Sequence, residues 1–474
     1  MPLPSYILWP LSIVLAIVIF SLAVFIHELG HFLVARLLGL KADVFSIGFG
    51  PALWKRDVGG TEIRFSAIPF GGYVSLPQLD PEGMKKIQGD HSDGSEEIIP
   101  PAAPWKRILV ALAGPFGNVV LAILCAMLIC YGAPDGATGG STELGIVYPQ
   151  SSAANAGLQA GDRILSVNGT AVRSWSDVQT ESFLSGTKDT TVTVGYERAG
   201  KRLETTAVLD TQLQPGEPYY IIGGMMPGPI SVGIGDVVPD SPAARAGLKR
   251  GDILKTVDGE PFVMMEQLTQ RKDAQKPVKL TIVSDGESRE VTLVPETLKL
   301  SDITPASDNE AKAIVAQAGR PRIGVVLAYF GQRQLQWMTE RGVMAQLKAD
   351  ANGVLRIFKA LMAPKTKGEA GRAASGLGGP LMIFGVLIHV VQTGLWVSLG
   401  FLRLICVNLA ILNLLPLPVL DGGHVIFALY AMIFRREISP RVLGVLSNVF
   451  AIALIGLMVW FLYQDSARLL RGLF

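Results

Sequence analysis

The chain has 474 residues, enough for two or three domains, and 49% of them are hydrophobic. Only 17% are charged, and the deficit from the roughly 25% of an ordinary soluble chain is concentrated in a few long apolar runs, which excludes a purely soluble protein. The net charge of +2 provides no basic field that would attract nucleic acid.

Four regions lack charge over the roughly 20 residues that a helix needs to cross the hydrocarbon of a membrane. They cover 1–26, 108–134, 373–420 and 442–464, and only Arg403 interrupts the third. The first has no basic segment before it and no small-residue cleavage site, so we expect a retained transmembrane helix rather than a signal peptide. The sequence therefore predicts four transmembrane helices.

The first apolar run passes without interruption into His27-Glu28-Leu29-Gly30-His31. Positions i and i+4 of a helix share one face, so both histidines can bind one metal ion. Glu28 would then lie beside the attacking water and could take its proton. Because ionisable residues are costly in hydrocarbon, we interpret this cluster as functional. The alternative is a polar helix end whose histidines are satisfied by hydrogen bonds.

A strand pattern follows, in which Ile63, Phe65 and Ala67 alternate with Glu62, Arg64 and Ser66. Glycine pairs flank the pattern, so the sequence predicts a β-hairpin close to the membrane face that holds His31. We expect an extended substrate segment to pair with its edge and to contact Arg64, Phe65, Ser66 and Ala67. The alternative is a hairpin that only braces the first two helices. Residues 88–104 are predicted to form a flexible linker.

The second helix contains the small and polar residues Gly114-Pro115-Phe116-Gly117-Asn118. Small residues in a membrane helix allow a neighbouring helix to pack closely. The same residues could form a polar lining for the metal site, and the sequence leaves both interpretations open.

An internal repeat lies between the second and third apolar regions, where residues 152–162 match residues 242–252. Each copy continues as a short strand and an Asn-Gly or Asp-Gly turn. The shared pattern A-x-x-A-G-L-x-x-G-D-x-I-L resembles that of bacterial PDZ domains, which bind extended chain ends by strand addition. The alternative is that both copies are structural spacers or steric plugs.

The third apolar region ends in Asn413-Leu414-Leu415-Pro416-Leu417-Pro418-Val419-Leu420-Asp421, followed by Gly422-Gly423-His424. A catalytic zinc site takes three protein ligands, and Asp421 is the best candidate for the third because it lies near the membrane depth of the two histidines. His424 is the rival third ligand. Asn413 is either a helix-end residue or a hydrogen-bond donor to the substrate carbonyl.

Two further features precede this motif. Apolar residues recur at helical spacing over 341–362, which predicts an amphipathic helix. Arg403 lies midway along the third apolar region, where we expect it to face the bundle interior or a carboxylate.

Basic residues mark the cytoplasmic side of membrane proteins. They flank the first connection at 36–41 and 106–107, and they occur again at 435–441. We therefore expect both termini and the repeats at 138–300 to lie outside the cytoplasm. The basic residues at 468–471 argue the other way.

Together these motifs resemble those of the site-2 protease family of intramembrane zinc metalloproteases, over nearly the whole chain. The likeness also includes Gly48-Phe49-Gly50-Pro51, Gly71-Gly72-Tyr73-Val74 and Leu377-Gly378-Gly379-Pro380. It implies a hairpin that enters the membrane before the second helix, and a multi-pass protein of the bacterial inner (cytoplasmic) membrane.

The resemblance also implies the site. His27, His31 and Asp421 would hold one zinc ion, Glu28 would act as general base, and Asn413 would contact the substrate. The implied substrates are single-pass anti-sigma factors already trimmed by another protease, and remnant signal peptides. Membrane lipid and PDZ ligands are the other expected partners, and nucleic acid is not one.

We therefore expect a zinc metalloendopeptidase that cuts transmembrane segments in regulated intramembrane proteolysis as part of a stress response. The main alternative is a PDZ-bearing membrane scaffold with a structural metal, in which Glu28 would have no role. A metal transporter would need ligands repeated along a path, and the chain shows one cluster.

The expected fold is a polytopic α-helical membrane protein with four transmembrane helices, two extracytoplasmic PDZ-like α+β domains and a membrane-associated β-hairpin. The predicted order is helix 1 with HExxH (1–41), a cytoplasmic-side segment with hairpin and linker (42–104), helix 2 (105–134), PDZ-like domains (138–225 and 226–300), an amphipathic helical region (301–370), the helix 3 region (371–434) and helix 4 (440–465).

Overall fold

The computed structural model describes the chain as two compact units. The membrane unit comprises residues 1–135, 214–217 and 340–474, and the repeat unit comprises residues 136–213 and 218–339. The described residues are 5–79, 102–133, 142–187, 189–214, 217–228, 230–262, 266–269, 276–284, 286–297, 321–331 and 342–473. The predicted linker at 88–104 lies almost wholly outside them.

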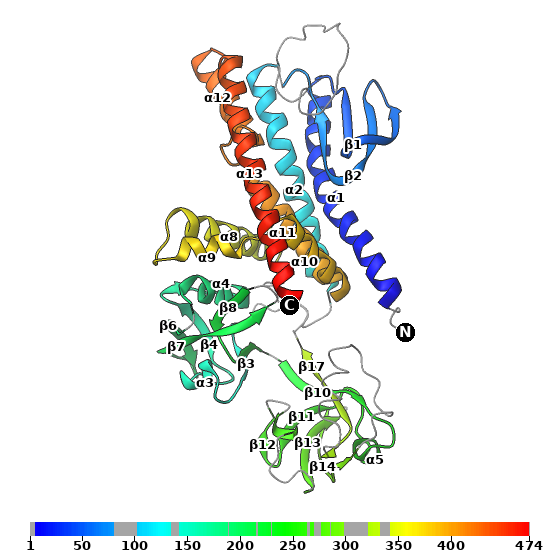
Figure 1. Ribbon diagram of the computed structural model, residues 1–474, viewed down its shortest axis with the longest axis vertical. Coiled ribbons are helices and arrows are strands. Elements are labelled where there is room, and N and C mark those ends of the chain that lie inside the picture. Colours follow the sequence, from blue (N-terminus) through cyan, green and yellow to red (C-terminus); the bar gives the residue numbers. More distant parts are fainter. Residues whose placement is uncertain are drawn as a thin grey trace. The chain divides into compact units, whose positions relative to one another are not determined.

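Four described helices of the membrane unit are long and apolar enough to cross a membrane (Figure 1). They are α1 (Ser5–Leu37), α2 (Pro104–Gly132), α11 (Leu395–Asn413) and α13 (Pro440–Leu473). These candidate spans agree with the predicted polytopic membrane protein, and a bent pair of helices, Glu369–Gly376 and Pro380–Thr393, is a candidate fifth span.

The third apolar region is more divided than the sequence indicates. It folds as α9 (Glu369–Gly376), α10 (Pro380–Thr393) and α11, and α9 is bent by 61° against α10. Pro380 cannot donate a backbone hydrogen bond and begins the new helix at its first turn. Asp465 of α13 caps this start, because its carboxylate accepts from the backbone N–H groups of Gly379 and Met382 at 3.1 and 3.0 Å.

The helix α2 is the centre of the membrane unit. It packs against α1, α11 and α12 (Asp421–Phe434), which surround it. Its buried face is rich in alanine and glycine, including Ala111, Ala122 and Ala126. Small residues allow helix backbones to approach closely in a membrane, where the hydrophobic effect does not drive association.

The predicted hairpin forms from β1 (Val44–Asp57) and β2 (Glu62–Ser75). Both strands bend, so residues 62–65 pair with 44–47 on one side and with 54–57 on the other. Arg64 and Phe65 therefore have no free edge in this structure, and the contact of a substrate with residues 62–68 stays a prediction. The outer segment, residues 72–75, pairs with 44–47.

The amphipathic helix predicted at 341–362 is confirmed as α8 (Val343–Met362). The expectation for Arg403 is also confirmed. This residue of α11 is fully buried, and its Nε donates to the Asp350 carboxylate of α8 at 2.6 Å. A charge inside the bundle is thus paired rather than exposed to hydrocarbon.

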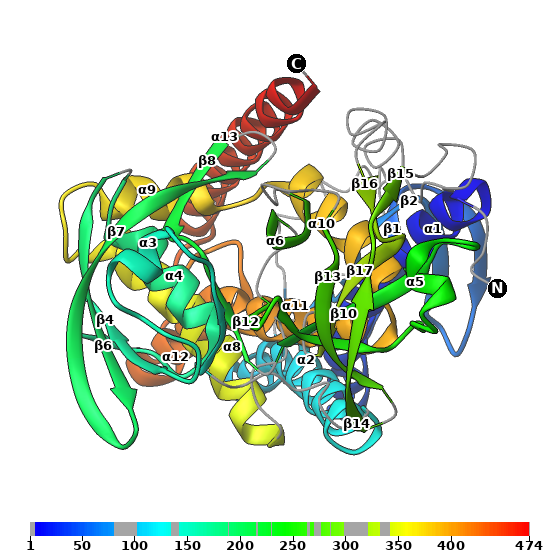
Figure 2. The same cartoon turned by 90° about the horizontal axis from the view of Figure 1, so that it is seen from below.

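The repeat unit consists of two lobes, each built on its own sheet (Figure 2). In the first lobe the sheet order is β5-β4-β6-β7-β8. Its elements are β3 (Leu144–Val147), α3 (Ser152–Asn155), β4 (Arg163–Val167), β5 (Thr170–Ala171), α4 (Trp175–Ser185), β6 (Thr191–Arg198), β7 (Lys201–Gln214), β8 (Glu217–Ile222) and β9 (Met225–Pro227).

In the second lobe the sheet order is β14-β13-β11-β10-β17. Its elements are β10 (Ile230–Val237), α5 (Pro242–Arg245), β11 (Ile253–Val257), β12 (Glu260–Pro261), α6 (Glu266–Thr269), β13 (Val278–Ser284), β14 (Glu287–Leu293), β15 (Glu296–Thr297), β16 (Pro321–Arg322) and β17 (Val325–Gly331). The strand β17 completes the sheet by pairing with β10, so this lobe continues past the predicted boundary at 300.

The repeated sequence folds in the same way in both lobes. Ser151 and Ser241 cap the short helices α3 and α5 by accepting from the backbone N–H three residues later. The turns Asn168-Gly169 and Asp258-Gly259 both have positive φ at each residue, as a tight two-residue hairpin turn requires. The repeat in the sequence therefore corresponds to a repeat in the fold.

A short ribbon, β3 paired with β9, belongs to both lobes. Leu144 and Met225 pack with the core of the first lobe. Ile146 and Met226 pack with the core of the second, whereas Val147, which follows Ile146, packs with the first. Adjacent residues of one strand therefore contribute to two cores.

Candidate metal centre

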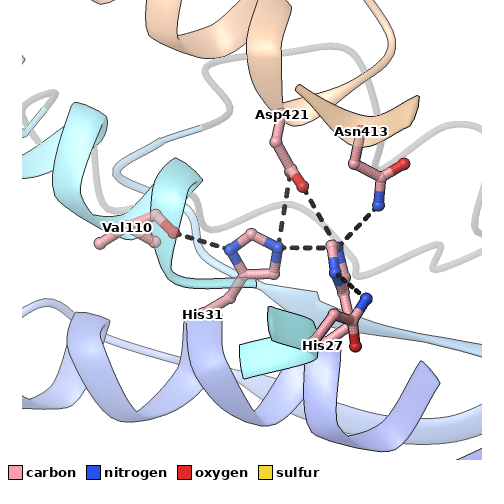
Figure 3. A network of polar contacts seen from close by, with 6 residues as sticks. His27, His31, Val110, Asn413 and Asp421 are labelled. Atoms are coloured by element: carbon pink, nitrogen blue, oxygen red, sulfur yellow. Dashed lines mark hydrogen bonds and ion pairs between the residues drawn. The ribbon is translucent and has the colours of Figure 1, made fainter. Parts of the chain in front are cut away.

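Three groups that can bind a metal meet where α1 approaches the start of α12 (Figure 3). His27 and His31 lie one turn apart on α1, and their Nε2 atoms are 3.2 Å apart. Asp421 is the first residue of α12, and its carboxylate oxygens lie 3.2 Å from His27 Nε2 and 3.5 Å from His31 Nε2. Both imidazoles are buried.

The donor set fits zinc. Nitrogen and oxygen ligands hold zinc at about 2.0–2.2 Å in a tetrahedron, which places ligand atoms about 3.3 Å from one another. The separation of the two Nε2 atoms and the shortest distance from each Nε2 to the Asp421 carboxylate lie close to this spacing. Moreover, Asp421 Oδ2 is buried and has no hydrogen-bond donor among the described residues, as expected of an oxygen that needs a cation. Two imidazoles and one carboxylate leave a fourth position open.

The helix α2 orients His31. His31 Nδ1 lies 2.8 Å from the carbonyl oxygen of Val110, so Nδ1 carries the proton and donates it to that oxygen. This tautomer leaves the Nε2 lone pair free for a metal. A backbone carbonyl leaves no trace in the sequence, so sequence reasoning could not have found this contact.

Asn118, also on α2, occupies the corresponding position beside His27. Its side-chain amide is fully buried and lies 3.2 Å from His27 Nδ1. The amide oxygen has no other partner in the described part of the chain, and the two ends of an amide have nearly the same shape. With its oxygen toward the ring, Asn118 accepts the Nδ1 proton and leaves Nε2 free for the metal. Asn118 is thus part of the polar lining considered above.

Close packing and polar lining occur together in α2. A side chain at Gly114 would overlap the His31 ring, and one at Gly117 would come 2.8 Å from the carbonyl oxygen of Ile26. Gly30 of α1 likewise packs directly on the backbone of Ala113. The glycines therefore bring α2 close enough for Val110 and Asn118 to reach the two imidazoles.

Glu28 lies between the two histidines on α1. It interacts electrostatically with both histidines and with Asp421, and it lies near the backbone of Val74 in β2. Gly72 of the same strand packs against the Glu28 side chain. The outer segment of the hairpin is therefore next to Glu28.

Asn413 ends α11 on the other side of the cluster. Its Nδ2 donates to His27 Nε2 at 3.0 Å (Figure 3). The chain then turns through Pro416 and Pro418 before α12 begins. Gly422 and Gly423 pack on the carbonyls of this turn so tightly that no side chain would fit. His424 is not in the cluster formed by the described residues, which contains Asp421 instead.

The structure places the other predicted substrate contacts differently. Arg64 is paired on both sides and bonded to Glu62 at 2.9 Å. Phe65 is half exposed and tilted against Trp54, and Ser66 is buried with its hydroxyl 3.1 Å from that of Ser46. Ala67 is exposed. Contacts between these residues and a substrate stay predictions.

Comparison with known proteins identifies the family. The model of peptidase family M50 matches residues 15–457. A protein of Neisseria meningitidis with the provisional name zinc metalloprotease is 34% identical over 94% of this chain and 96% of its own length.

Two further relatives carry more specific names. The regulator of sigma-E protease RseP of Escherichia coli is 30% identical over 96% of this chain and 98% of its own. The protease RseP of Yersinia pestis is 29% identical over 98% and 99%. This membrane-spanning chain therefore belongs to peptidase family M50 and is a zinc metalloprotease.

Proposed function

We propose that this metalloprotease hydrolyses peptide bonds within the transmembrane segments of single-pass membrane proteins. One observation supports this above all others. His27 and His31 lie inside the apolar span 9–37 of α1, and Asp421 joins them at the same depth. A peptide bond that reaches the three side chains must therefore itself enter the membrane.

In this proposal His27, His31 and Asp421 hold one zinc ion, which supplies Lewis acidity toward the scissile carbonyl and the attacking water. Glu28 accepts the proton of the attacking water and later delivers it to the leaving amine. Val110 and Asn118 hold the two imidazoles in the tautomer that keeps Nε2 available.

Asn413 is proposed to bind the substrate. Its amide now donates to His27 Nε2, and a ligand nitrogen in a metal site cannot accept that hydrogen bond. The amide N–H is then free for the carbonyl of the bond being cut. Of the two roles that the sequence left open for Asn413, this is the one that the family resemblance implies.

A helical substrate hides its carbonyls in internal hydrogen bonds, so it must be extended before it is cut. We assign this function to the outer hairpin segment 72–75, which lies next to Glu28, rather than to residues 62–68. Pairing between backbones tolerates many side chains, which suits an enzyme that cuts varied apolar segments.

The name of one relative supports a proposal for the substrate class. The Escherichia coli relative is named a regulator of sigma-E protease, so we propose that this chain cuts anti-sigma factors after another protease has trimmed them, and also remnant signal peptides. The basic residues at 36–41 and 106–107 support a bacterial inner-membrane protein with the repeat unit outside the cytoplasm.

The two lobes of the repeat unit are proposed to be PDZ-like and to restrict access by size. The equivalent caps and turns of the lobes support a duplicated domain, and the edge strands β8 and β17 would suit strand addition by a chain end. A role as spacers alone is the alternative.

The test is Glu28→Gln with a tagged single-pass substrate in reconstituted membranes. We expect cleavage to fall by at least about 10²–10⁴-fold, because a general base is lost, while zinc content stays near one per chain. In this inactive enzyme a substrate cysteine near the scissile bond should crosslink to a cysteine at Tyr73.

A variant that keeps cutting near the wild-type rate would show that Glu28 is not the base. If the wild type binds zinc but cuts no membrane substrate, the scaffold with a structural metal is the better account. Crosslinks confined to α11 would mean that the hairpin only braces the helices.

A further inference from the structure

The helix α8 is fixed in rotation by a polar inner face. Asp350 pairs with Arg403 of α11, with Nε and Nη2 donating at 2.6 and 3.1 Å. Gln346, one turn earlier, accepts from Arg403 and donates to the carbonyl oxygen of Ala126 in α2 at 3.3 Å. These bonds require Gln346 and Asp350 to point inward.

The same bonds set the depth of α8. Ala126 lies six residues before the end of α2, and Arg403 lies eight residues after the start of α11, which is about 9–12 Å along each helix. The end of α2 lies next to the start of α11, since a side chain at Gly132 would come 2.6 Å from Trp396. With 29 residues, α2 is about 44 Å long and exceeds a hydrocarbon core of about 30 Å. The first half of α8 therefore lies at the boundary of the hydrocarbon rather than in bulk water.

The outward face of α8 combines large apolar and basic side chains. Its five members lie within about 60° around the helix axis, opposite Gln346 and Asp350. They are Met344, Lys348, Leu355, Lys359 and Met362, and all are exposed. The three apolar members are 62%, 54% and 83% exposed. An apolar stripe interrupted by lysines suits the interface of a membrane, where long basic side chains reach the headgroups.

Charge selects the kind of lipid. The turn from α8 to α9 adds the exposed Lys365 and Lys367. Both acidic residues of residues 342–377 are buried and paired with arginine, Asp350 with Arg403 and Glu369 with Arg356. The exposed charges within residues 342–377 are therefore all basic.

We propose that this surface, the exposed face of α8 together with Lys365 and Lys367, binds the headgroups of anionic phospholipids. The lysines contact the phosphates, and Met344, Leu355 and Met362 lie among the upper acyl chains. A protein or a second copy on this face would need acidic groups to match the lysines, whereas an anionic lipid surface supplies them at the depth where α8 lies. The proposal does not depend on what the enzyme cuts.

The experiment measures binding of phosphatidylglycerol and phosphatidylcholine to the purified full chain by native mass spectrometry. At 0.15 M salt we expect the wild type to prefer phosphatidylglycerol by about fivefold or more, the contribution of a single surface lysine. Combined Lys348→Glu, Lys359→Glu, Lys365→Glu and Lys367→Glu should abolish the preference. The control Arg173→Glu, Lys201→Glu, Arg202→Glu and Arg250→Glu changes exposed residues of the repeat unit by the same charge and should keep it.

Zinc content and helix content report whether each variant is folded. If the fourfold variant loses them, Lys365→Glu with Lys367→Glu, outside any helix, should still reduce the preference. Persistence of the preference in these variants, or equal loss in the control, overturns the proposal. Full competition by glycerol phosphate would show a site for free anions instead of lipid, and a dimer that the variant dissolves would show a second copy on this face.

Discussion

The His31 imidazole has almost no room on its α2 side, because Gly114 lies against it. We expect Gly114→Ala to displace the ring and to weaken zinc binding by about 10–100-fold, the effect of losing an orienting contact on a metal ligand. The matched control is Gly385→Ala in α10, where a side chain meets nothing within 4 Å. The zinc affinity of both variants is measured with a competing chelator. Equal affinities would contradict the packing argument.

The third ligand can be tested directly. Asp421→Ala should lose both zinc and activity, because two histidines alone rarely hold a catalytic ion. His424→Ala should keep about one zinc per chain, since His424 is not in the cluster. The reverse result, zinc retained in the first variant and lost in the second, would reassign the ligand to His424.

At the scale of residues, the sequence was informative about ligands and less so about their surroundings. His27, Glu28 and His31 could be predicted because helix geometry fixes their relation within one turn. Asp421 lies nearly 400 residues later, and it was connected by the argument from membrane depth and by the family resemblance. Val110 could not be found at all, since its contribution is a carbonyl that every residue has.

At the scale of elements, the packing of α8 against α11 is the most sensitive to a single substitution. Asp350→Ala leaves the Arg403 charge buried without its partner, so we expect a loss of about 3–5 kcal/mol in the free energy of unfolding. The double variant Asp350→Leu with Arg403→Met should recover most of the loss, because no charge then stays buried. Denaturant-induced unfolding in detergent micelles measures the free energy of unfolding of both variants. If the double variant is destabilised as much as Asp350→Ala, this account is contradicted.

The hairpin shows where periodicity is insufficient. Alternation over 62–68 correctly predicted a strand, but it carries no information on how many neighbours that strand has. Because β1 bends back, residues 62–65 became an inner strand and 72–75 an outer one. Likewise the apolar count of the third region predicted a span, while the break before α10 depends on Pro380 and on a carboxylate from the end of α13.

At the scale of the whole molecule, the repeat unit is predicted to select substrates. Deleting residues 142–331 should leave zinc content unchanged and allow cleavage of substrates whose outer domains have not been trimmed. The deletion extends to 331 because β17 completes the second sheet. Cleavage of trimmed and untrimmed substrates by the wild type and the deletion is compared. If the deletion still rejects the untrimmed substrate, the repeats do not act as a filter.

The ribbon of β3 and β9 has a consequence for exchanging parts between relatives. A chimera joined at the predicted boundary near 225 would separate β9 from one of its two cores, since Met225 packs in the first lobe and Met226 in the second. Replacing one lobe alone would leave Ile146 facing a foreign interior. The two lobes, although duplicated in sequence, therefore form a single folding unit. Only chimeras that transfer both lobes together with the ribbon should fold.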